Sequence, residues 1–381
     1  MTAYRSPWSD DELDAFRDAV RRFASNVLAP REPSWQAARR VDPASWREVG
    51  AMGMLLAGVP DAYGGGGGTF AHDCVVFEEL EYAGVVSLGK HVHEICAHYV
   101  LAHGTEDQKR RWLPRMARGE LVGAIAMSEP SAGSDLQGVR TRAVRAGGEY
   151  VLNGSKTFIS NGQISGLICV VAKSDVSVGA SGISLIMVET DELAGFRRGT
   201  TLDKLGLHGQ DTSELYFDDC RVPAENLLGG TEGAGFAQLM EQLPYERAII
   251  GVVAVAAMER AVRLTTDYAR ERRAFGKALV DMQNTRFALA EAKTIAHVGR
   301  VFIDSCIERC IAGTLDTATA SMAKWWLTDM QCRVIDECLQ LHGGYGYMLE
   351  YPIARMYADA RAQRIYGGTN EIMKEIIARA L

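Results

Sequence analysis

The sequence predicts a multidomain α+β protein in which a strand-rich region lies between two helical regions. Apolar residues recur at spacings of three and four over 9–119 and again over 230–381, which is the period of an amphipathic helix. Between these regions the period falls to two, and glycines separate short apolar runs, as expected for strands. The predicted domains are an N-terminal helical domain (1–119), a middle antiparallel β-barrel or sandwich (120–229) and a C-terminal four-helix bundle (230–381).

Length and composition agree with a folded protein of this kind. The 381 residues suggest two or three domains, and the contents of hydrophobic (47%) and charged (23%) residues are close to the average for soluble globular proteins. The net charge is −7 and no basic run exceeds three residues, which argues against a nucleic-acid partner. The longest apolar run, 248–258, is shorter than the ~20 residues of a bilayer span, so no membrane span is expected.

The cysteines and the N-terminal residues bear on the compartment. Eight cysteines occur without a CxxC pair, and a chain of 381 residues needs no disulfides to stabilise its core. We therefore expect reduced thiols in a cytoplasmic protein. The acidic residues Asp10, Asp11, Glu12 and Asp14 argue against a secretory signal or a transit peptide.

In the N-terminal region, helix signals follow one another. Ser9 to Glu12 has the pattern of a capping box, and the helix that it begins is expected to end at Pro30. Asp42 and Pro43 begin a second helix, and Thr105 to Gln108 is another capping box, whose helix ends at Gly119. Two further helices are expected over 71–82 and 92–102.

The middle region shows hairpin and strand signals. Asn153-Gly154 lies between two short apolar runs (150–152 and 156–159) and predicts a tight hairpin turn, because both residues favour positive φ. Further strands are expected over 167–172, 183–188 and 214–217. In the C-terminal region the helical period predicts helices near 232–271, 282–312, 316–342 and 367–380.

Three patterns that could suggest a binding site are interpreted as structural. The five glycines at 64–68 follow no strand, so they predict a flexible surface loop instead of a phosphate loop. Cys306 and Cys310 share a helix face without a third ligand and are expected to pack in the core. Zinc-binding helices place two histidines four residues apart, whereas His93 and His98 are five apart. No metal site is predicted, and partly buried helix histidines are the preferred interpretation of His91, His93 and His98 beside Glu94.

Four separate segments carry the strongest functional signal. The first is the loop Ala126-Met127-Ser128-Glu129-Pro130-Ser131-Ala132-Gly133-Ser134-Asp135, and the second is Lys156-Thr157-Phe158-Ile159-Ser160-Asn161-Gly162. The third, Arg270 to Gly276, is followed by Gln283. The fourth, Gln340-Leu341-His342-Gly343-Gly344, is followed by Arg364 to Glu371. In this order and at this spacing, they resemble the acyl-CoA dehydrogenase family of flavoproteins over nearly the whole chain.

The resemblance implies one FAD per subunit, a homotetramer and a set of binding residues. Met127, Ser128, Phe158 and Ser160 would contact the flavin ring, with Phe158 where many relatives carry Trp. Ser134 would bind the acyl-CoA, and Arg247 and Gly368 would help to form its pocket. The resemblance places the remaining cofactor contacts at Thr369 and Glu371 of the flavin pocket and, from neighbouring subunits, at Arg272, Phe275, Gln283, Gln340, Gly343 and Gly344.

The sequence departs from the commonest family pattern at the catalytic base. Many relatives carry Glu where this chain has Gly367, whereas the long-chain and isovaleryl-type branches place the base on an earlier helix, at the position of Glu246. Taken alone, Glu246 could be an ordinary first-turn acid that follows Pro244 and is favoured by the helix dipole. With no carboxylate at 367, the resemblance implies that Glu246 is the base.

The implied reaction is α,β-dehydrogenation of an acyl-CoA thioester to a trans-2-enoyl-CoA. Glu246 would remove the α-proton, the N–H of Gly367 and the ribityl 2′-hydroxyl would polarise the thioester carbonyl, and the β-hydride would pass to flavin N5. An electron-transfer flavoprotein would accept the electrons. The alternatives on the same scaffold are an acyl-carrier-protein dehydrogenase, a flavin oxidase or monooxygenase, and a catalytically silent flavin-binding protein.

Overall fold

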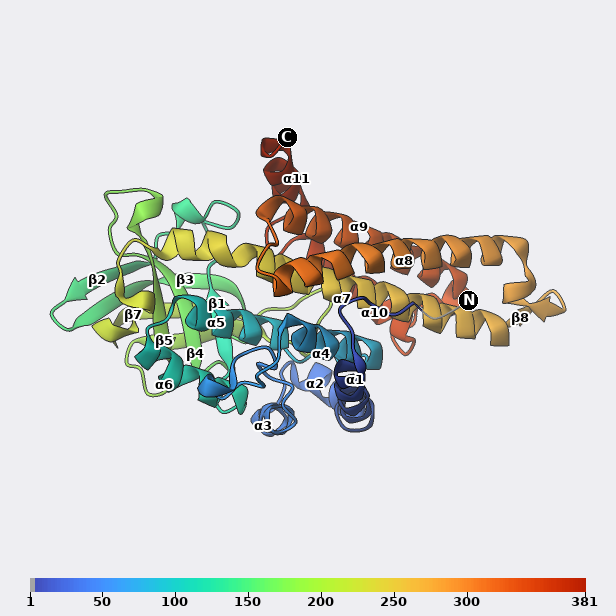
Figure 1. Ribbon diagram of the computed structural model, residues 1–381, viewed down its shortest axis with the longest axis horizontal. Coiled ribbons are helices and arrows are strands. Elements are labelled where there is room, and N and C mark those ends of the chain that lie inside the picture. The colour runs from blue at the N-terminus through green and yellow to red at the C-terminus, as the bar shows by residue number, and fades with distance from the viewer. Residues whose placement is uncertain (1–3) are drawn as a thin grey trace.

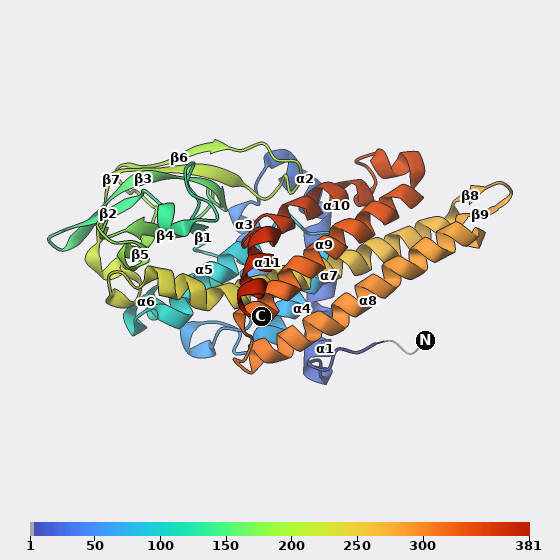
Figure 2. The ribbon, with the colours of Figure 1, turned by 90° about the horizontal axis from the view of Figure 1, so that it is seen from above.

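A computed structural model describes residues 4–381 and shows a sheet region, a long helical bundle and a layer of shorter helices (Figure 1). Seen from above, the sheet lies at one end of the molecule, and the bundle helices run away from it toward the opposite end (Figure 2). No helix among the described residues is both long and apolar enough to cross a membrane.

The N-terminal layer is helical, and its first helix differs in detail from the prediction. Asp10 is the N-cap, because its side chain accepts a hydrogen bond from the N–H of Leu13, while Ser9 hydrogen-bonds Asp14 instead. Pro30 does not end the helical path, which continues through a π-turn (Ala24–Leu28) and a 3-10 turn (Ala29–Arg31). The helices of this layer are α1 (Asp11–Phe23), α2 (Glu32–Ala38), α3 (Pro43–Ala51), α4 (Phe70–Ala83), α5 (Lys90–His103) and α6 (Glu106–Ala117).

The five-glycine segment is a loop, as predicted, but its backbone is held in place. The N–H groups of Gly66 and Gly68 donate to the carbonyls of Leu56 and Ala57 at 3.1 and 3.0 Å. A Cβ at Gly65 would lie 2.2 Å from the carbonyl oxygen of Val59, so only glycine allows this approach. The glycines therefore serve close backbone packing.

The middle region forms one seven-stranded sheet in the order β1-β4-β2-β3-β7-β6, with β5 paired to β4. It is mixed and not purely antiparallel, since β1 pairs with β4 in parallel, Gly123 opposite Leu167. The β2–β3 hairpin lies between these two strands in the chain and provides the crossover that parallel pairing needs. The strands are β1 (Gly123–Ala126), β2 (Arg142–Ala146), β3 (Glu149–Ser160), β4 (Leu167–Lys173), β5 (Ile183–Glu189), β6 (Phe196–Thr201) and β7 (Thr212–Pro223).

The hairpin turn predicted at Asn153-Gly154 is wrong. Both residues lie inside β3, at an irregularity in its pairing with β7. Gly154 has φ +155°, and a Cβ there would lie 2.4 Å from Oγ1 of Thr141, so the glycine serves a close contact and not a turn. The turn between β2 and β3 is instead formed by Gly147 and Gly148.

The C-terminal region contains the four predicted helices and one more. A short hairpin (β8, Arg273–Ala274; β9, Lys277–Ala278) connects the first two helices at the end of the bundle far from the sheet (Figure 2). The helix α10, which follows the Gly343-Gly344 segment, was not predicted. The helices are α7 (Gly235–Glu271), α8 (Gln283–Ile311), α9 (Thr317–Leu341), α10 (Pro352–Ala360) and α11 (Asn370–Arg379).

The core has two parts that meet at β4. Leu167, Cys169 and Val171 belong to the large core shared with the helices, whereas Ile168 and Val170 belong to the smaller core inside the curled sheet. Both faces of β4 are thus buried, which explains its uninterrupted apolar run. On the helical side of the sheet, α5 packs against β1 and α7 packs against β5.

Candidate active site

Glu246 lies in the second half of the chain, near the beginning of α7, and its side chain is buried. The residue is 6% exposed, and its Oε1 accepts a hydrogen bond from the Tyr99 hydroxyl of α5 at 2.7 Å. Burial raises the pKa of Glu246, while the Tyr99 hydrogen bond and the charge of Arg247 oppose this rise. A carboxylate with a raised pKa is suited to accept a proton near neutral pH.

Arg247 follows the base and faces the turn formed by Gly367 and Gly368. Its Nη1 donates to Oγ of Ser321 at 3.2 Å, and its buried Nε has no partner among residues 4–381. A Cβ built at Gly368 would lie 3.9 Å from its Nη2. The guanidinium therefore has an unused N–H beside this turn.

The turn itself is held by a buried lysine. Gly367 and Gly368 have φ of +66° and +90°, which favours glycine at both positions. Lys324 of α9 donates to the carbonyl oxygen of Gly368 at 2.7 Å and to Oδ1 of Asn370 at 2.8 Å. Sequence reasoning missed Lys324, although a lysine inside the apolar run 322–327 was a visible signal.

The same turn lies against the helix face that carries the base. A Cβ built at Gly367 would meet only Ile250, whose Cδ1 is 2.5 Å away. Ile250 is four residues after Glu246 and therefore lies one turn further along the same face of α7. The structure thus brings together the two predicted catalytic residues, Glu246 and Gly367, with Arg247 and Gly368 beside them.

The loop after β1 and the end of β3 form one rigid unit. The N–H of Thr157 donates to the carbonyl of Ser128 at 3.0 Å. Lys156, which is buried, donates to the carbonyl of Met127 at 3.0 Å and to the carboxylate of Glu129 at 2.9 Å. Burial lowers the pKa of Lys156 to about 8, and the Glu129 carboxylate opposes this shift. Sequence reasoning quoted both residues but did not anticipate their pairing.

Phe158 has the geometry expected of a residue that contacts a ligand. It lies at a bulge in β3, has φ +60° and is 70% exposed, and both the backbone conformation and the exposure are unusual for a phenylalanine. Ser160 is half-buried on the same strand. With Met127 and Ser128 beside this strand, the surface offers an aromatic face and a hydroxyl, which fit a flavin ring.

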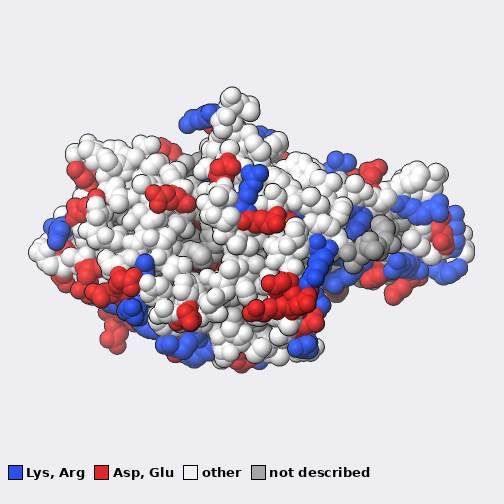
Figure 3. All heavy atoms as spheres, in the orientation of Figure 1, with Lys and Arg blue, Asp and Glu red and all other residues white. Residues whose placement is uncertain are grey.

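The other predicted cofactor residues lie at the opposite end of the bundle. Arg272 lies over the ring of Tyr345 at 5.5 Å, and Phe275 is 95% exposed at the tip of the β8–β9 hairpin. The tip is basic, as Figure 3 shows at its right-hand end. Within one chain, the β8–β9 hairpin lies at the opposite end of the molecule from β3, the strand that carries Phe158 (Figure 2). We call these residues the distal group. All of its members are exposed, and they are Arg272, Phe275, Gln283, Gln340, Gly343 and Gly344.

The last predicted residues lie around the turn and in the β1 loop. Thr369 is the N-cap of α11, where its hydroxyl accepts from the N–H of Ile372. Glu371 is exposed in the first turn of that helix, and Ser134 is exposed in the loop after β1.

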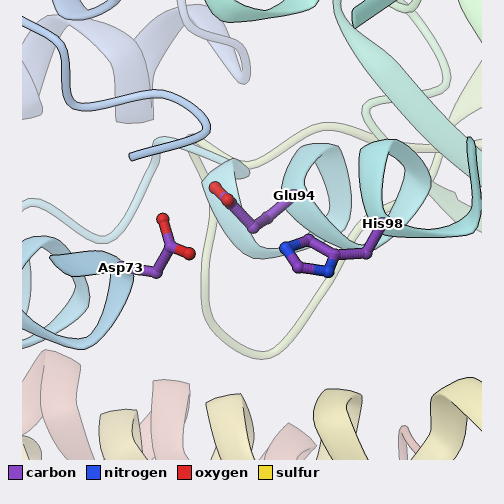
Figure 4. A group of neighbouring side chains, drawn as sticks. All are labelled: Asp73, Glu94 and His98. Atoms are coloured by element: carbon purple, nitrogen blue, oxygen red, sulfur yellow. The ribbon is translucent and has the colours of Figure 1, made fainter. Parts of the chain in front are cut away.

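Titratable side chains of α4 and α5 form a cluster inside the protein (Figure 4). Asp73, Glu94 and His98 bring possible ligand atoms within 4.8 Å of one another. Lys90 approaches Glu94 at 2.5 Å and Asp73 at 3.8 Å. Burial raises the pKa of Asp73 well above its usual value and lowers that of His98 to about 4. The raised pKa of Asp73 favours its neutral form, whereas the pKa of Glu94 is lowered by the facing Lys90, so the carboxylate charge of the cluster lies on the glutamate. His98 also stacks on Tyr245 with ring centroids 3.9 Å apart.

A cavity lies one turn of α7 beyond Glu246 and next to the residue that precedes the glycine turn. Ile250 and Tyr366 line it at this end, and it continues between α4, α5, α7, α9 and α10. Along α7, its lining residues are one to three turns beyond Glu246, so the cavity follows that helix away from the base. Its apolar lining includes Phe77, Leu80, Ile249, Val253, Ala257 and Ile335.

Comparisons with known proteins agree with this geometry. Family models described as acyl-CoA dehydrogenase N-terminal, middle and C-terminal domains match residues 10–120, 124–220 and 233–381. The rat protein "Long-chain specific acyl-CoA dehydrogenase, mitochondrial" is 46% identical over 373 residues, which cover 97% of this chain and 86% of the rat protein. The potato protein "Isovaleryl-CoA dehydrogenase, mitochondrial" is 34% identical over 382 residues, with 98% and 91% covered.

Solved structures give the same result. The acyl-CoA dehydrogenase of Geobacillus kaustophilus superposes with a TM-score of 0.96 at 45% identity, covering 99% of both chains. A chain in a structure of the electron transferring flavoprotein of Acidaminococcus fermentans gives 0.93 at 34% identity, with 99% of both chains covered. A glutaryl-CoA dehydrogenase from Mycobacterium smegmatis in complex with FADH2 gives 0.91 at 28% identity, with 98% and 95% covered.

Proposed function

The chain belongs to the acyl-CoA dehydrogenase family, and we propose that it oxidises long-chain acyl-CoA thioesters with Glu246 as the only catalytic base. As a member of this family it is an FAD-dependent oxidoreductase of acyl-CoA thioesters in fatty-acid metabolism. One observation carries the assignment of the base. Glu246 is buried and hydrogen-bonded on the face of α7 that meets the turn at Gly367. Position 367 itself carries no carboxylate in this chain.

The residues of this site divide the work of the reaction. Glu246 accepts the α-proton of the bound thioester, and its burial disfavours the ionised form in the absence of substrate. The N–H of Gly367 donates to the thioester carbonyl, which makes the α-proton more acidic. The buried Nε–H of Arg247, which has no partner among the described residues, is available to organise the pocket around a bound thioester. When bound beside Phe158, FAD supplies the acceptor for the β-hydride.

The course of the cavity along α7, which encloses about 80 Å³ in the protein without ligand, supports a long acyl chain as the substrate. From Glu246 to Ala257, which lines its far half, the helix rises about 16 Å at ~1.5 Å per residue. An extended chain advances ~1.2 Å per bond, so this length takes roughly 13 bonds. The similarity to the rat long-chain enzyme supports the same substrate class.

Further features of the protein are part of the proposal. A homotetramer is supported by the distal group, because those residues contact FAD only if a neighbouring copy brings them to it. An electron-transfer flavoprotein as acceptor is supported by the Acidaminococcus structure. A cytoplasmic location is supported by eight free cysteines. The bounds of the three family models support a division into domains 1–119, 120–229 and 230–381.

The test of this function is a pair of variants at the two glutamate positions. Glu246→Gln retains the shape of the side chain but cannot accept the α-proton, so anaerobic flavin reduction by hexadecanoyl-CoA is expected to fall by about 10²–10⁴-fold or more. FAD content is expected to stay unchanged. Adding Gly367→Glu to this variant is expected to restore part of the rate, and only part, because the new Cβ meets Ile250 and the glycine's positive φ is strained for glutamate. Reduction of Glu246→Gln at the wild-type rate would overturn the assignment.

A further inference from the structure

Two buried glutamines line the acyl cavity without using their side-chain amides. Gln331 of α9 is 2% exposed and Gln363, just after α10, is 6% exposed. The amide oxygens of both have no hydrogen-bond partner within the part of the chain that the structure describes. A buried amide without a partner costs roughly 1–3 kcal/mol, so two of them on one apolar cavity wall require a physical reason.

The depth of these amides follows from the packing of α9 against α7. A Cβ at Gly251 would lie 3.1 Å from Leu327, and Thr265 lies 3.3 Å from the ring of His342, so the two helices run in the same direction. These two contacts fix which residues of α7 and α9 lie side by side, and they place Gln331 level with the part of α7 between Val253 and Ala257. This level is about nine residues, or ~13 Å, beyond Glu246. At ~1.2 Å per bond it lies roughly 11 bonds along an extended acyl chain.

Acidic groups surround the same part of the cavity. Glu81 of α4 and Asp359 of α10 both line it, with Arg260 at 3.7 Å from Glu81 and the N–H of Leu207 at 2.5 Å from Asp359. Burial raises the pKa of Glu81 to about 7 and that of Asp359 to about 6. A negatively charged chain end would meet two carboxyl groups here, and the one lysine among the described lining residues, Lys90, already pairs with Glu94. A neutral hydroxyl, in contrast, can donate to an amide oxygen and accept from an amide N–H.

We propose that the substrates of this enzyme are long-chain acyl-CoA thioesters that carry a hydroxyl group about 10 bonds beyond the α-carbon, held by Gln331 and Gln363. The inference rests on the proposed function, because the acyl chain must enter the cavity beside Glu246. An unsubstituted chain leaves both amides without partners. A site with buried groups that are satisfied only by the correct ligand discriminates strongly against an analogue that lacks the hydroxyl.

The experiment compares hexadecanoyl-CoA with 12-hydroxyhexadecanoyl-CoA. For the wild type we expect kcat/KM of flavin reduction to be at least about tenfold higher with the hydroxylated thioester, since one good hydrogen bond to a buried amide contributes about 1.4 kcal/mol, or tenfold. Gln331→Met is expected to remove or invert this preference. Its melting temperature is expected to rise, because the substitution removes an unpaired amide at nearly constant volume. Gln363→Met is the second variant, with the same expectation.

The control is Gln238→Met, a buried glutamine of α7 that donates to the carbonyl of Leu228 and does not line the cavity. It is expected to leave the preference unchanged. Equal kcat/KM for the two thioesters in the wild type, or an unchanged preference in both cavity variants, would overturn the inference.

A binding measurement separates this inference from the proposed function. In Glu246→Gln, which cannot turn over, calorimetric titration with the two thioesters gives their affinity ratio directly. Tighter binding of the hydroxylated chain supports the hydroxyl site even if the wild type fails to reduce its flavin with either thioester, a failure that would count against the dehydrogenase function alone. Equal affinities would overturn the inference whatever the outcome of the kinetics.

Discussion

In the proposed reaction, the hydrogen bond between Tyr99 and Glu246 is expected to set the pH range in which Glu246 acts as the base. The hydroxyl donates to the carboxylate at 2.7 Å inside the protein, so it stabilises the ionised form and lowers a pKa that burial has raised. Hydrogen bonds to charged groups contribute about 1.5–3 kcal/mol. At 1.36 kcal/mol per pKa unit, Tyr99→Phe is therefore expected to raise the pKa of Glu246 by about one to two units.

The assay is the pH dependence of anaerobic flavin reduction by a saturating acyl-CoA, followed by stopped-flow absorbance. The rising limb of the profile, where the base loses its proton, is expected to move to higher pH by about one to two units. Well above that limb, the rate is expected to return close to the wild-type value. Tyr245→Phe is the matched control, because the Tyr245 hydroxyl is buried without a partner among the described residues. A limb that stays in place in Tyr99→Phe, or moves equally in both variants, would refute the reasoning.

Three further predictions concern stability. Burial raises the pKa of Glu246 above its ordinary 4.5, so the stabilising contribution of this residue is present below pH 4.5 and is lost as the pH rises through the folded pKa. Calorimetry should therefore show Glu246→Gln melting above the wild type only at high pH. Lys324→Met leaves the Gly368 carbonyl without its donor, so urea unfolding should show a loss of about 1–3 kcal/mol, with the partly exposed Lys374→Met unchanged. Lys156→Met leaves the buried Glu129 carboxylate with two backbone N–H donors but without its cation, and should cost about 3–5 kcal/mol in urea and release FAD more readily; equal stability would contradict the pairing.

The sequence predicts those parts of the fold whose signal is local and long. The C-terminal helices keep one apolar period over many turns, and α7, α8 and α9 lie within a few residues of the predicted ranges. The Asn153-Gly154 prediction is wrong for the opposite reason. The turn propensity of two residues says nothing of the pairing with β7, which holds them inside a strand.

The candidate site likewise contains residues that the sequence predicts and residues that only the packing of the helices reveals. Glu246 could be predicted as the base because the resemblance supplies two alternative positions for one carboxylate, and only one of them is occupied in this chain. Tyr99 could not be found, because its role depends on α5 packing against α7, 147 residues away along the chain. The same holds for Gln331 and Gln363, whose unpaired amides are visible only once the cavity is known.

Because the proposed base, Glu246, lies on α7 and not in the glycine turn, its position and that of the turn are held by different contacts. A carboxylate at position 367 would be placed by a turn with two left-handed residues, whose position depends on Lys324. On α7, the carboxylate is carried by a 37-residue helix and oriented by Tyr99, so its position does not depend on the turn. The turn then has only to present the N–H of Gly367 to the thioester carbonyl. In the proposed reaction, proton abstraction and carbonyl polarisation are thus assigned to two elements that approach each other at Ile250 and Arg247, each held by its own hydrogen bonds.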